Sequence, residues 1–264
     1  MSFVGALLIN KLFENYYKAR KSILENRIEN FLKKKVDLGD YSGIRLLGIS
    51  LSNSQIFDNG NLNSEISVKN IYIGVMPIRS FLNQRWIFKI TPKQTKININ
   101  KEFFKNGDYN NGERKSLEDK FYYDLNFNLH ESANFKLNDL GIEGRVKGTF
   151  IYKSKSNHFI GNIKSHLKDK GDLNLKLNTM LDKNFLNFEI LSRGINFKGS
   201  EYTLGDRKFS FKGGKLKSNF KFHKSSKKTY CKGNVSLNKL KLKTTNLVED
   251  IQTDSIKFLC KGNN

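Results

Sequence analysis

The sequence predicts a mostly β protein with one N-terminal α-helix, and three observations support this prediction. The first 35 residues carry apolar side chains at helical spacing, and no Gly or Pro interrupts them after Gly5. After Gly39, apolar and polar residues alternate over many short stretches, as in strands with one buried face. Only two prolines occur beside twenty glycines, so few strands are blocked from pairing and many turns or bulges are available.

The composition indicates an ordered but thin architecture. Apolar residues make up 38% of the 264-residue chain, which is low for a globular domain with a generous core. Yet 21 Phe and 10 Tyr are present, and disordered chains lack such aromatic content. We therefore expect an elongated, curled antiparallel sheet with a groove-like apolar face, built from serial strands punctuated by glycine.

Residues 1–35 form the first predicted segment, an amphipathic or membrane-proximal helix. Its apolar stretch at residues 3–9 is shorter than the ~20 residues that span a bilayer. Three interpretations stay open: a helix packed on its own domain, a helix on a membrane surface, and the remainder of a membrane anchor. The basic residues that would face anionic lipid are Lys18, Arg20, Lys21, Arg27, Lys33, Lys34 and Lys35.

Three further segments follow the helix. Residues 36–104 are expected to form a first β unit, and residues 105–120 a polar loop rich in Asn, Gly and charge. Residues 121–264 are expected to form a repeating β-groove segment, because an apolar residue followed by Lys-Gly recurs there at irregular spacing. The copies of this pattern end at Gly148, Gly199, Gly213, Gly233 and Gly262. Since the last copy is followed by only two residues, the array is predicted to be truncated at its C-terminus.

The alternation also predicts which side chains line the apolar face. Every second side chain of a strand points to the same side of a sheet, and the opposite positions here are mostly Lys, Asn, Asp, Ser and Thr. A closed barrel or a two-layer sandwich would bury such a face as well, so both stay open as alternatives. The predicted groove residues are Leu125, Phe127, Leu173, Leu175, Leu177, Phe188, Phe209, Phe211, Phe220, Phe222, Leu237 and Leu242.

The net charge of +22 concerns partners more than fold. Nucleic acid and an anionic membrane surface are the two candidate partners, and an AT-rich genome that favours Lys would give the same charge without a function. No helix-turn-helix, zinc knuckle or aromatic ribonucleoprotein motif accompanies the basic residues. Because the lysines alternate with apolar residues, we interpret them as the solvated face of the sheet and do not expect a specific nucleic-acid site.

The sequence contains no recognisable catalytic constellation. Phosphate-binding loops, nucleophile elbows and zinc-protease motifs are missing, and no histidine pair has ligand spacing. The four histidines are His130, His158, His166 and His223. We therefore expect no enzymatic activity, no metal and no cofactor. Cys231 and Cys260 are widely spaced; a disulfide between them is possible, but we interpret them as two small apolar strand residues.

The order of motifs in the first third of the chain resembles a known family. The basic helix of residues 16–35 leads into Val-Asp-Leu-Gly at 36–39 and then into the Gly-Ile-Arg-Leu-Leu-Gly-Ile-Ser-Leu-Ser hairpin at 43–52. The stretch 71–82 ends in a short hydrophobic turn that begins with Pro77, and the Arg-apolar strand 85–92 closes at Pro92. This order is similar to the N-terminal region of TamB proteins (translocation and assembly module subunits), especially the cyanobacterial and plastid ones, within the AsmA-like group.

The resemblance implies a long β-groove with an apolar concave face that bridges the inner and outer membranes. It implies a role in envelope biogenesis, in outer-membrane protein assembly or phospholipid transfer, and a location at the inner membrane facing the periplasm. The implied partners are anionic membrane lipids, phospholipid acyl chains and an outer-membrane barrel of the Omp85 type. An alternative function is a non-enzymatic β-scaffold bound to anionic membranes through the basic helix, and nucleic-acid binding comes third.

Overall fold

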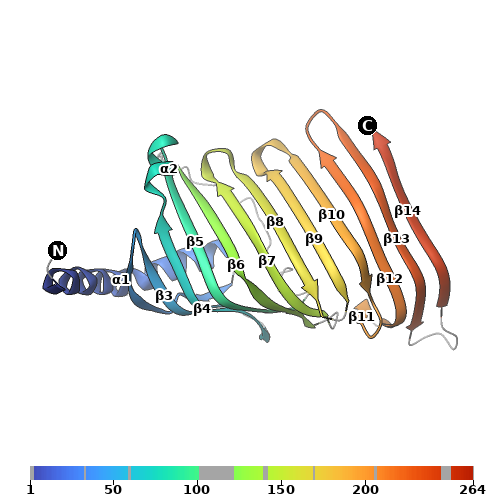
Figure 1. The fold of residues 1–264 in the computed structure, drawn as a ribbon, viewed down its shortest axis with the longest axis horizontal. Helices are drawn as coiled ribbons and strands as arrows, with labels where there is room; N and C mark the ends of the chain where they lie inside the picture. Colours follow the sequence, from blue (N-terminus) through green and yellow to red (C-terminus); the bar gives the residue numbers. More distant parts are fainter. Residues whose placement is uncertain are drawn as a thin grey trace. The chain divides into compact units, whose positions relative to one another are not determined.

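The computed structural model describes residues 3–32, 34–58, 61–100, 122–138, 142–168, 170–204, 207–244 and 251–263. The chain divides into two compact units, Met1–Ala133 and Asn134–Asn264, which we call unit 1 and unit 2. The predicted fold class is confirmed, since an N-terminal helix is followed by one open antiparallel sheet (Figure 1). The polar loop expected at 105–120 lies outside the described residues.

The strands follow one another through the sheet in chain order. Hydrogen-bonded neighbours run β1-β3-β4-β5-β6-β7-β8-β9-β10-β12-β13-β14, while β2 pairs with β3 and β11 with β12. The first strands are β1 (Lys35–Asp37), β2 (Asp40–Arg45), β3 (Gly48–Asp58), β4 (Asn61–Val75), β5 (Trp86–Ile99) and β6 (Tyr123–Leu137). The later ones are β7 (Ile142–Lys153), β8 (His158–Leu167), β9 (Gly171–Met180), β10 (Phe185–Asn196), β11 (Glu201–Leu204), β12 (Arg207–Lys224), β13 (Thr229–Thr244) and β14 (Ile251–Asn263).

Two helices belong to unit 1. Helix α1 (Phe3–Leu32) is shorter than the predicted segment 1–35, because Lys35 already begins β1. Helix α2 (Pro77–Leu82) connects β4 to β5, and Pro77 suits its first turn, where the missing backbone N–H costs nothing. The resemblance had predicted only a short hydrophobic turn at this position.

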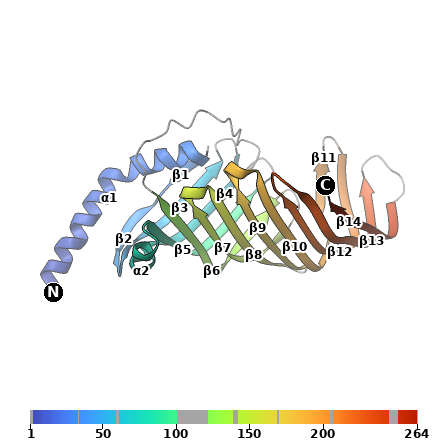
Figure 2. The same cartoon turned by 90° about the horizontal axis from the view of Figure 1, so that it is seen from above.

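Left-handed residues inside strands change which sequence positions face the apolar side. In β5 the apolar side chains occupy even-numbered residues before Gln94, such as Ile90, and odd-numbered residues after it, such as Ile97. Gln94 has φ 51°, and Asn53 on β3 has the same value. Around Gln94 the buried positions are Pro92 and Thr95 and the exposed ones are Lys93 and Gln94, so the left-handed residue shares a face with the residue before it. Figure 2 shows the curving strands of unit 1. The apolar face therefore continues although the alternation in the sequence slips by one.

Unit 2 is built almost entirely from a meander of strands. Short 3₁₀ turns at Ser154–Ser156 and Leu181–Lys183 close two of its hairpins. Each turn ends in a left-handed asparagine, Asn157 and Asn184, which suits a residue type that tolerates positive φ. The small buried core of the unit consists of Ile142, Leu167 and Ile195, with partly buried apolar neighbours packed against it.

The boundary between the two compact units falls between Ala133 and Asn134, within β6. Cys231 and Cys260 form a disulfide, so their interpretation as two unlinked strand residues was wrong. The register explains the bond: Cys231 pairs with Gly262 and Gly233 pairs with Cys260, so the two cysteines are diagonal neighbours with Cα atoms 5.6 Å apart.

Candidate functional site

The predicted groove residues of unit 2 lie in rows that cross several strands. Directly paired residues of an antiparallel ladder share one face. Phe188 of β10 pairs with Leu177 of β9 on one side and with Phe222 of β12 on the other. In the next row, Ile190 pairs with Leu175 and with Phe220. The structure thus brings these predicted residues together and adds Ile190, which alternates with Leu186 and Phe188 in β10.

A third row contains small polar side chains between apolar ones. Leu173 pairs with Ser192, which pairs with Ser218, which in turn pairs with Val235. The two serines are buried, the Ser218 hydroxyl donates to Ser192 Oγ at 3.1 Å, and Ser192 donates to the backbone oxygen of Leu216 at 3.2 Å. Since both hydroxyls are satisfied within the sheet, this row does not make the face polar.

A bulged region carries the face past the middle of β12 and β13. A Cβ placed on Gly214 would lie 3.6 Å from Leu237 Cδ1 and 3.5 Å from Leu240 Cδ1, so both leucines approach the same side of β12. They are three positions apart in β13, and the left-handed Lys239 (φ 52°) lies between them. The predicted residues beyond this point, Phe211 and its partner Leu242, therefore stay on the apolar side.

An aromatic contact joins this distal part of the face to the small core. The ring of Phe211 lies 5.4 Å from the ring of Phe197, which packs against the core around Ile195. Phe209 pairs with Thr244 one step further along the same strand. Phe197 was not among the predicted groove residues, although Ile195 and Phe197 alternate in the sequence; it lies just after the end of β10 at Asn196.

Every predicted groove residue is half-buried, and none is fully buried. In a closed barrel or sandwich the large aromatic residues of such a face would be enclosed on both sides. Among the described residues of unit 2, every strand belongs to the one sheet, and the buried apolar side chains are few: Ile142, Leu167, Ile195 and Leu240. The face is therefore a single apolar layer that the described part of unit 2 leaves partly open to solvent.

The remaining two predicted groove residues, Leu125 and Phe127, lie in the part of β6 that belongs to unit 1. Both are half-buried and occupy alternate positions of the strand. They share one face of β6 with Leu129, which is buried.

The opposite face of unit 2 is basic. One row crosses Lys176, Glu189, Lys221, Lys232 and Lys261 on five neighbouring strands. Glu189 carries two ion pairs, to Lys221 at 3.0 Å and to Lys176 at 3.3 Å. The hydrogen bond from Lys221, and then that from Lys176, hold the pKa of Glu189 below its ordinary value. The lysines therefore lie on the solvated side, as the alternation predicted.

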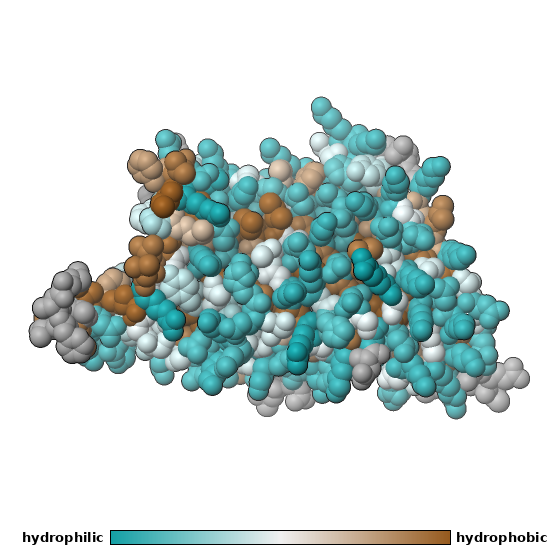
Figure 3. Space-filling view, in the orientation of Figure 1, coloured by the Kyte–Doolittle hydropathy of each residue, from teal (hydrophilic) through white to brown (hydrophobic). Residues whose placement is uncertain are grey.

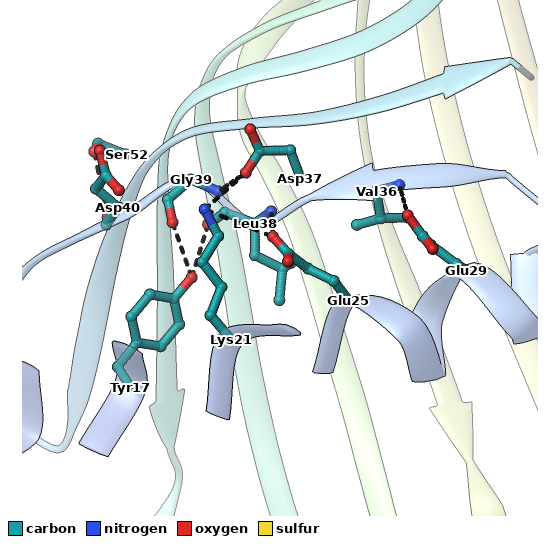
Figure 4. Close-up of polar contacts among 10 residues, drawn as sticks. All are labelled: Tyr17, Lys21, Glu25, Glu29, Val36, Asp37, Leu38, Gly39, Asp40 and Ser52. Carbon is teal, nitrogen blue, oxygen red and sulfur yellow. Dashed lines mark hydrogen bonds and ion pairs between the residues drawn. The ribbon is translucent and has the colours of Figure 1, made fainter. Parts of the chain in front are cut away.

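The second half of α1 is fixed to the edge of the sheet by a stripe of polar side chains (Figure 4). The Tyr17 hydroxyl donates to the backbone oxygens of Leu38 and Gly39 at 2.9 and 3.0 Å. Burial, with nearby carboxylates, raises the pKa of Tyr17. One and two turns further along the helix, Lys21 pairs with Asp37 at 2.9 Å and Glu25 accepts from the backbone N–H of Leu38 at 2.9 Å.

The last member of this stripe, Glu29, accepts the backbone N–H of Val36 at 2.9 Å. The two glutamates thus satisfy the N–H groups of Val36 in β1 and of Leu38 just after it, which this sheet edge would otherwise leave to solvent or to another chain. Sequence reasoning missed the stripe, although the four-residue spacing of Tyr17, Lys21, Glu25 and Glu29 marks one helix face.

The membrane-surface candidates have different environments. Lys34 is buried and pairs with the buried Asp58 at 2.7 Å, so its assignment to a lipid-facing surface was wrong. Lys21 and Lys18 form ion pairs, with Asp37 and with Glu14 at 2.6 Å. Arg20 lies over the Tyr16 ring, and Arg27 and Lys35 are exposed. The last candidate, Lys33, lies outside the described residues.

The described residues contain no group of three or more His, Cys, Asp or Glu side chains that could hold a metal ion. The described histidines make ordinary contacts: His158 Nε2 lies 2.6 Å from Asn178 Oδ1, and His166 Nδ1 lies 2.7 Å from Asp172 Oδ1. Neither helix, over its described length, is long and apolar enough to cross a membrane. Comparisons with protein-family models, curated proteins and solved structures found no match to the chain.

Proposed function

We propose that this chain is an envelope-biogenesis protein of the TamB and AsmA-like type, and that the apolar face of unit 2 binds phospholipid acyl chains. The observation that carries the proposal is the set of half-buried rows, in which Leu177, Phe188 and Phe222 lie side by side on three neighbouring strands. A layer of this kind is stabilised when a flexible apolar molecule covers it.

The chemistry of the face suits transfer better than storage of one tightly bound ligand. Burying an acyl CH₂ group contributes about 0.8 kcal/mol without a preferred direction. The polar groups closest to the rows, Ser192 and Ser218, are already bonded within the sheet. No fixed polar partner on these rows would hold a lipid at one position, so an acyl chain is free to slide across the strands.

The disulfide supports a location outside the cytosol. Bonds such as Cys231–Cys260 persist in oxidising compartments, among them the bacterial periplasm. A chain associated with the inner membrane and facing the periplasm would meet phospholipid on one side and outer-membrane assembly factors on the other. Within this proposal, an Omp85-type barrel is the protein partner that the resemblance implies.

The proposal is tested by the lipid content of the purified protein. The chain is isolated from bacterial envelopes, and its bound phospholipid is extracted and quantified by mass spectrometry. We expect phospholipid with the parent chain and loss of most of it from Phe188→Asn/Phe222→Asn, because both substitutions place an amide in one apolar row. Lys232→Asn changes an exposed residue of the basic row on the opposite face and is expected to keep the lipid.

Circular dichroism separates lost binding from lost folding. The double variant should keep the β signal of the parent chain, because both rings are only half-buried and lie in a single apolar layer. If the parent chain never carries phospholipid and the double variant unfolds, the face is an ordinary core and the proposal fails.

A further inference from the structure

A second apolar surface lies in unit 1, apart from the sheet rows described above. It is formed by the turn between β2 and β3, by α2 and by the start of β5. Its members, which we call the apolar tip, are Leu46, Leu47, Ile78, Phe81, Leu82 and Trp86. Figure 3 shows hydrophobic side chains gathered over α2 and between α2 and α1.

Hydrogen bonds hold these separate stretches together. The Tyr72 hydroxyl donates to the backbone oxygen of Leu46 at 2.7 Å, and the Val75 N–H donates to the oxygen of Leu47 at 2.8 Å. Val75 ends β4 immediately before α2, and the Met76 N–H then donates to Ile87 of β5 at 2.8 Å. The β2–β3 turn, α2 and the start of β5 are therefore one contiguous edge of unit 1.

The tip residues protrude from the fold and do not line a core. Leu46 is 87% exposed, Phe81 84% and Leu82 73%. Phe81, Leu82 and Trp86 border a hollow between α2 and the start of β5, whereas Leu46, Leu47 and Ile78 lie outside it and have no wall of this kind beside them. Side chains that project this far suit a fluid apolar medium, which adapts to them, better than a protein partner, which would need a pocket for each one.

The first half of α1 extends the same edge. Asn10 Oδ1 accepts from the Tyr41 hydroxyl at 2.8 Å and from the Ile44 N–H at 3.2 Å, so this part of the helix lies against the β2–β3 hairpin. Its apolar residues are exposed: Leu7, Leu8, Leu12, Phe13 and Tyr16. The polar stripe that fixes the helix to the sheet begins only at Tyr17.

The charges around the tip match an anionic surface. Arg45 adjoins the β2–β3 turn, Arg79 lies within α2, and both are exposed. The acidic residue close to α2 is Asp124, which is buried and paired with Arg85 at 3.0 Å. Basic residues beside a bilayer are attracted to anionic headgroups, and tryptophan favours the interface between headgroups and acyl chains.

We infer that the apolar tip and the first half of α1 dock unit 1 onto an anionic membrane, with Phe81, Leu82 and Leu46 inserted among the acyl chains. In the basic second half of the helix, which the sequence had suggested for this contact, one face is bound to the sheet edge through Tyr17, Lys21, Glu25 and Glu29, while Arg20 and Arg27 stay exposed. The inference does not depend on lipid binding by the apolar face of unit 2, because the two surfaces share no residue.

The test is flotation of the full chain with phosphatidylcholine vesicles that contain phosphatidylglycerol. Phe81→Ser/Leu82→Ser should lower the partition coefficient by about tenfold for each side chain withdrawn from the acyl region. Leu191→Ser/Leu259→Ser is the matched control, since these leucines are 37% and 79% exposed, lie outside the tip, and pair with Asn174 and Asn234 on the face opposite the apolar rows. The control should float like the parent chain.

Trp86 provides an independent readout, because it is the only tryptophan of the chain and belongs to the tip. Its emission should shift to shorter wavelength with the vesicles, and lipids carrying a quencher in the acyl region should quench it. Equal flotation of the tip variant and the parent chain would overturn the inference. An unshifted Trp86 emission would overturn it as well. So would a dimer of the parent chain in size-exclusion chromatography that the tip variant abolishes, because a second copy of the chain would then cover the tip.

Discussion

The two units of the chain are stabilised in different ways. In unit 1 a helix is fixed to the sheet edge by specific polar contacts, among them Tyr17 with two backbone oxygens and the buried pair Lys34–Asp58. Unit 2, in its described part, is a bare layer of strands whose cohesion comes from ladder pairing, a small core around Ile195 and one disulfide. Directional polar contacts hold one geometry, whereas a half-buried apolar layer is completed by what covers it.

The largest expected effect comes from breaking the buried ion pair of unit 1. Asp58→Asn removes the carboxylate that pairs with the buried Lys34 ammonium, which should lower the free energy of unfolding by about 3–5 kcal/mol. Trp86 fluorescence in urea reports this transition, because the single tryptophan lies in unit 1. Glu131→Gln, at the exposed ion pair with Lys93 in the same unit, is the matched control and should cost less than about 1 kcal/mol. Equal losses from the two variants would contradict the difference in burial.

The disulfide is the corresponding test in unit 2. Cys231→Ser/Cys260→Ser removes a link between residues 29 positions apart in the chain. Loop entropy for that separation predicts a loss of about 3–4 kcal/mol in the free energy of unfolding. The β signal in circular dichroism should then be lost at lower urea concentration, while the Trp86 transition of unit 1 should stay where it is. A reducing agent should reproduce the effect in the parent chain. An unchanged β transition would show that ladder pairing alone holds β13 and β14.

A smaller effect is expected where the helix meets the sheet edge. Tyr17→Phe removes the donor for the Leu38 and Gly39 oxygens, which should cost about 1–3 kcal/mol. Tyr16→Phe changes the neighbouring, exposed tyrosine and should stay within about 0.5 kcal/mol. If the two substitutions have the same effect in urea denaturation, the helix is not fixed by this contact.

The smallest effect belongs to the basic face of unit 2. The Lys221 and Lys176 ammonium groups lower the pKa of Glu189, so its contribution to stability is present above the ordinary carboxyl value of 4.5 and is lost as the pH falls through the lowered value. Glu189→Gln should therefore destabilise by less than about 1 kcal/mol near neutral pH. The difference from the parent chain should vanish on the acid side of the carboxyl titration. A difference that persists in acid would assign the loss to packing.

Alternation in the sequence was sufficient to predict the fold class and most of the apolar face. Leu173, Leu175 and Leu177 occupy one side of β9 because the period of a strand is two. The same rule fails where one residue turns left-handed. Lys and Gln are not residue types that favour positive φ, so the left-handed conformations of Lys239 and Gln94 could not be foreseen from propensity.

Contacts that depend on register were also beyond the sequence. The Cys231–Cys260 bond requires the pairing of β13 with β14, and two cysteines at that separation carry no motif. Lys34 looked like one member of a basic run, and only the position of Asp58 buries it. The apolar tip joins residues from three separate stretches that no local pattern connects.

The central claim is that acyl chains occupy one face of the unit 2 sheet, and site-specific photo-crosslinking tests it most directly. A photoreactive phenylalanine analogue is placed at Phe188 or Phe222 on the apolar rows, and at Asn187 or Lys232 on the other face of the same region. After irradiation in bacterial envelopes, phospholipid adducts are identified by mass spectrometry. The account predicts adducts from Phe188 and Phe222 and none from Asn187 and Lys232. Adducts from both faces in equal amount, or from neither face, would contradict it.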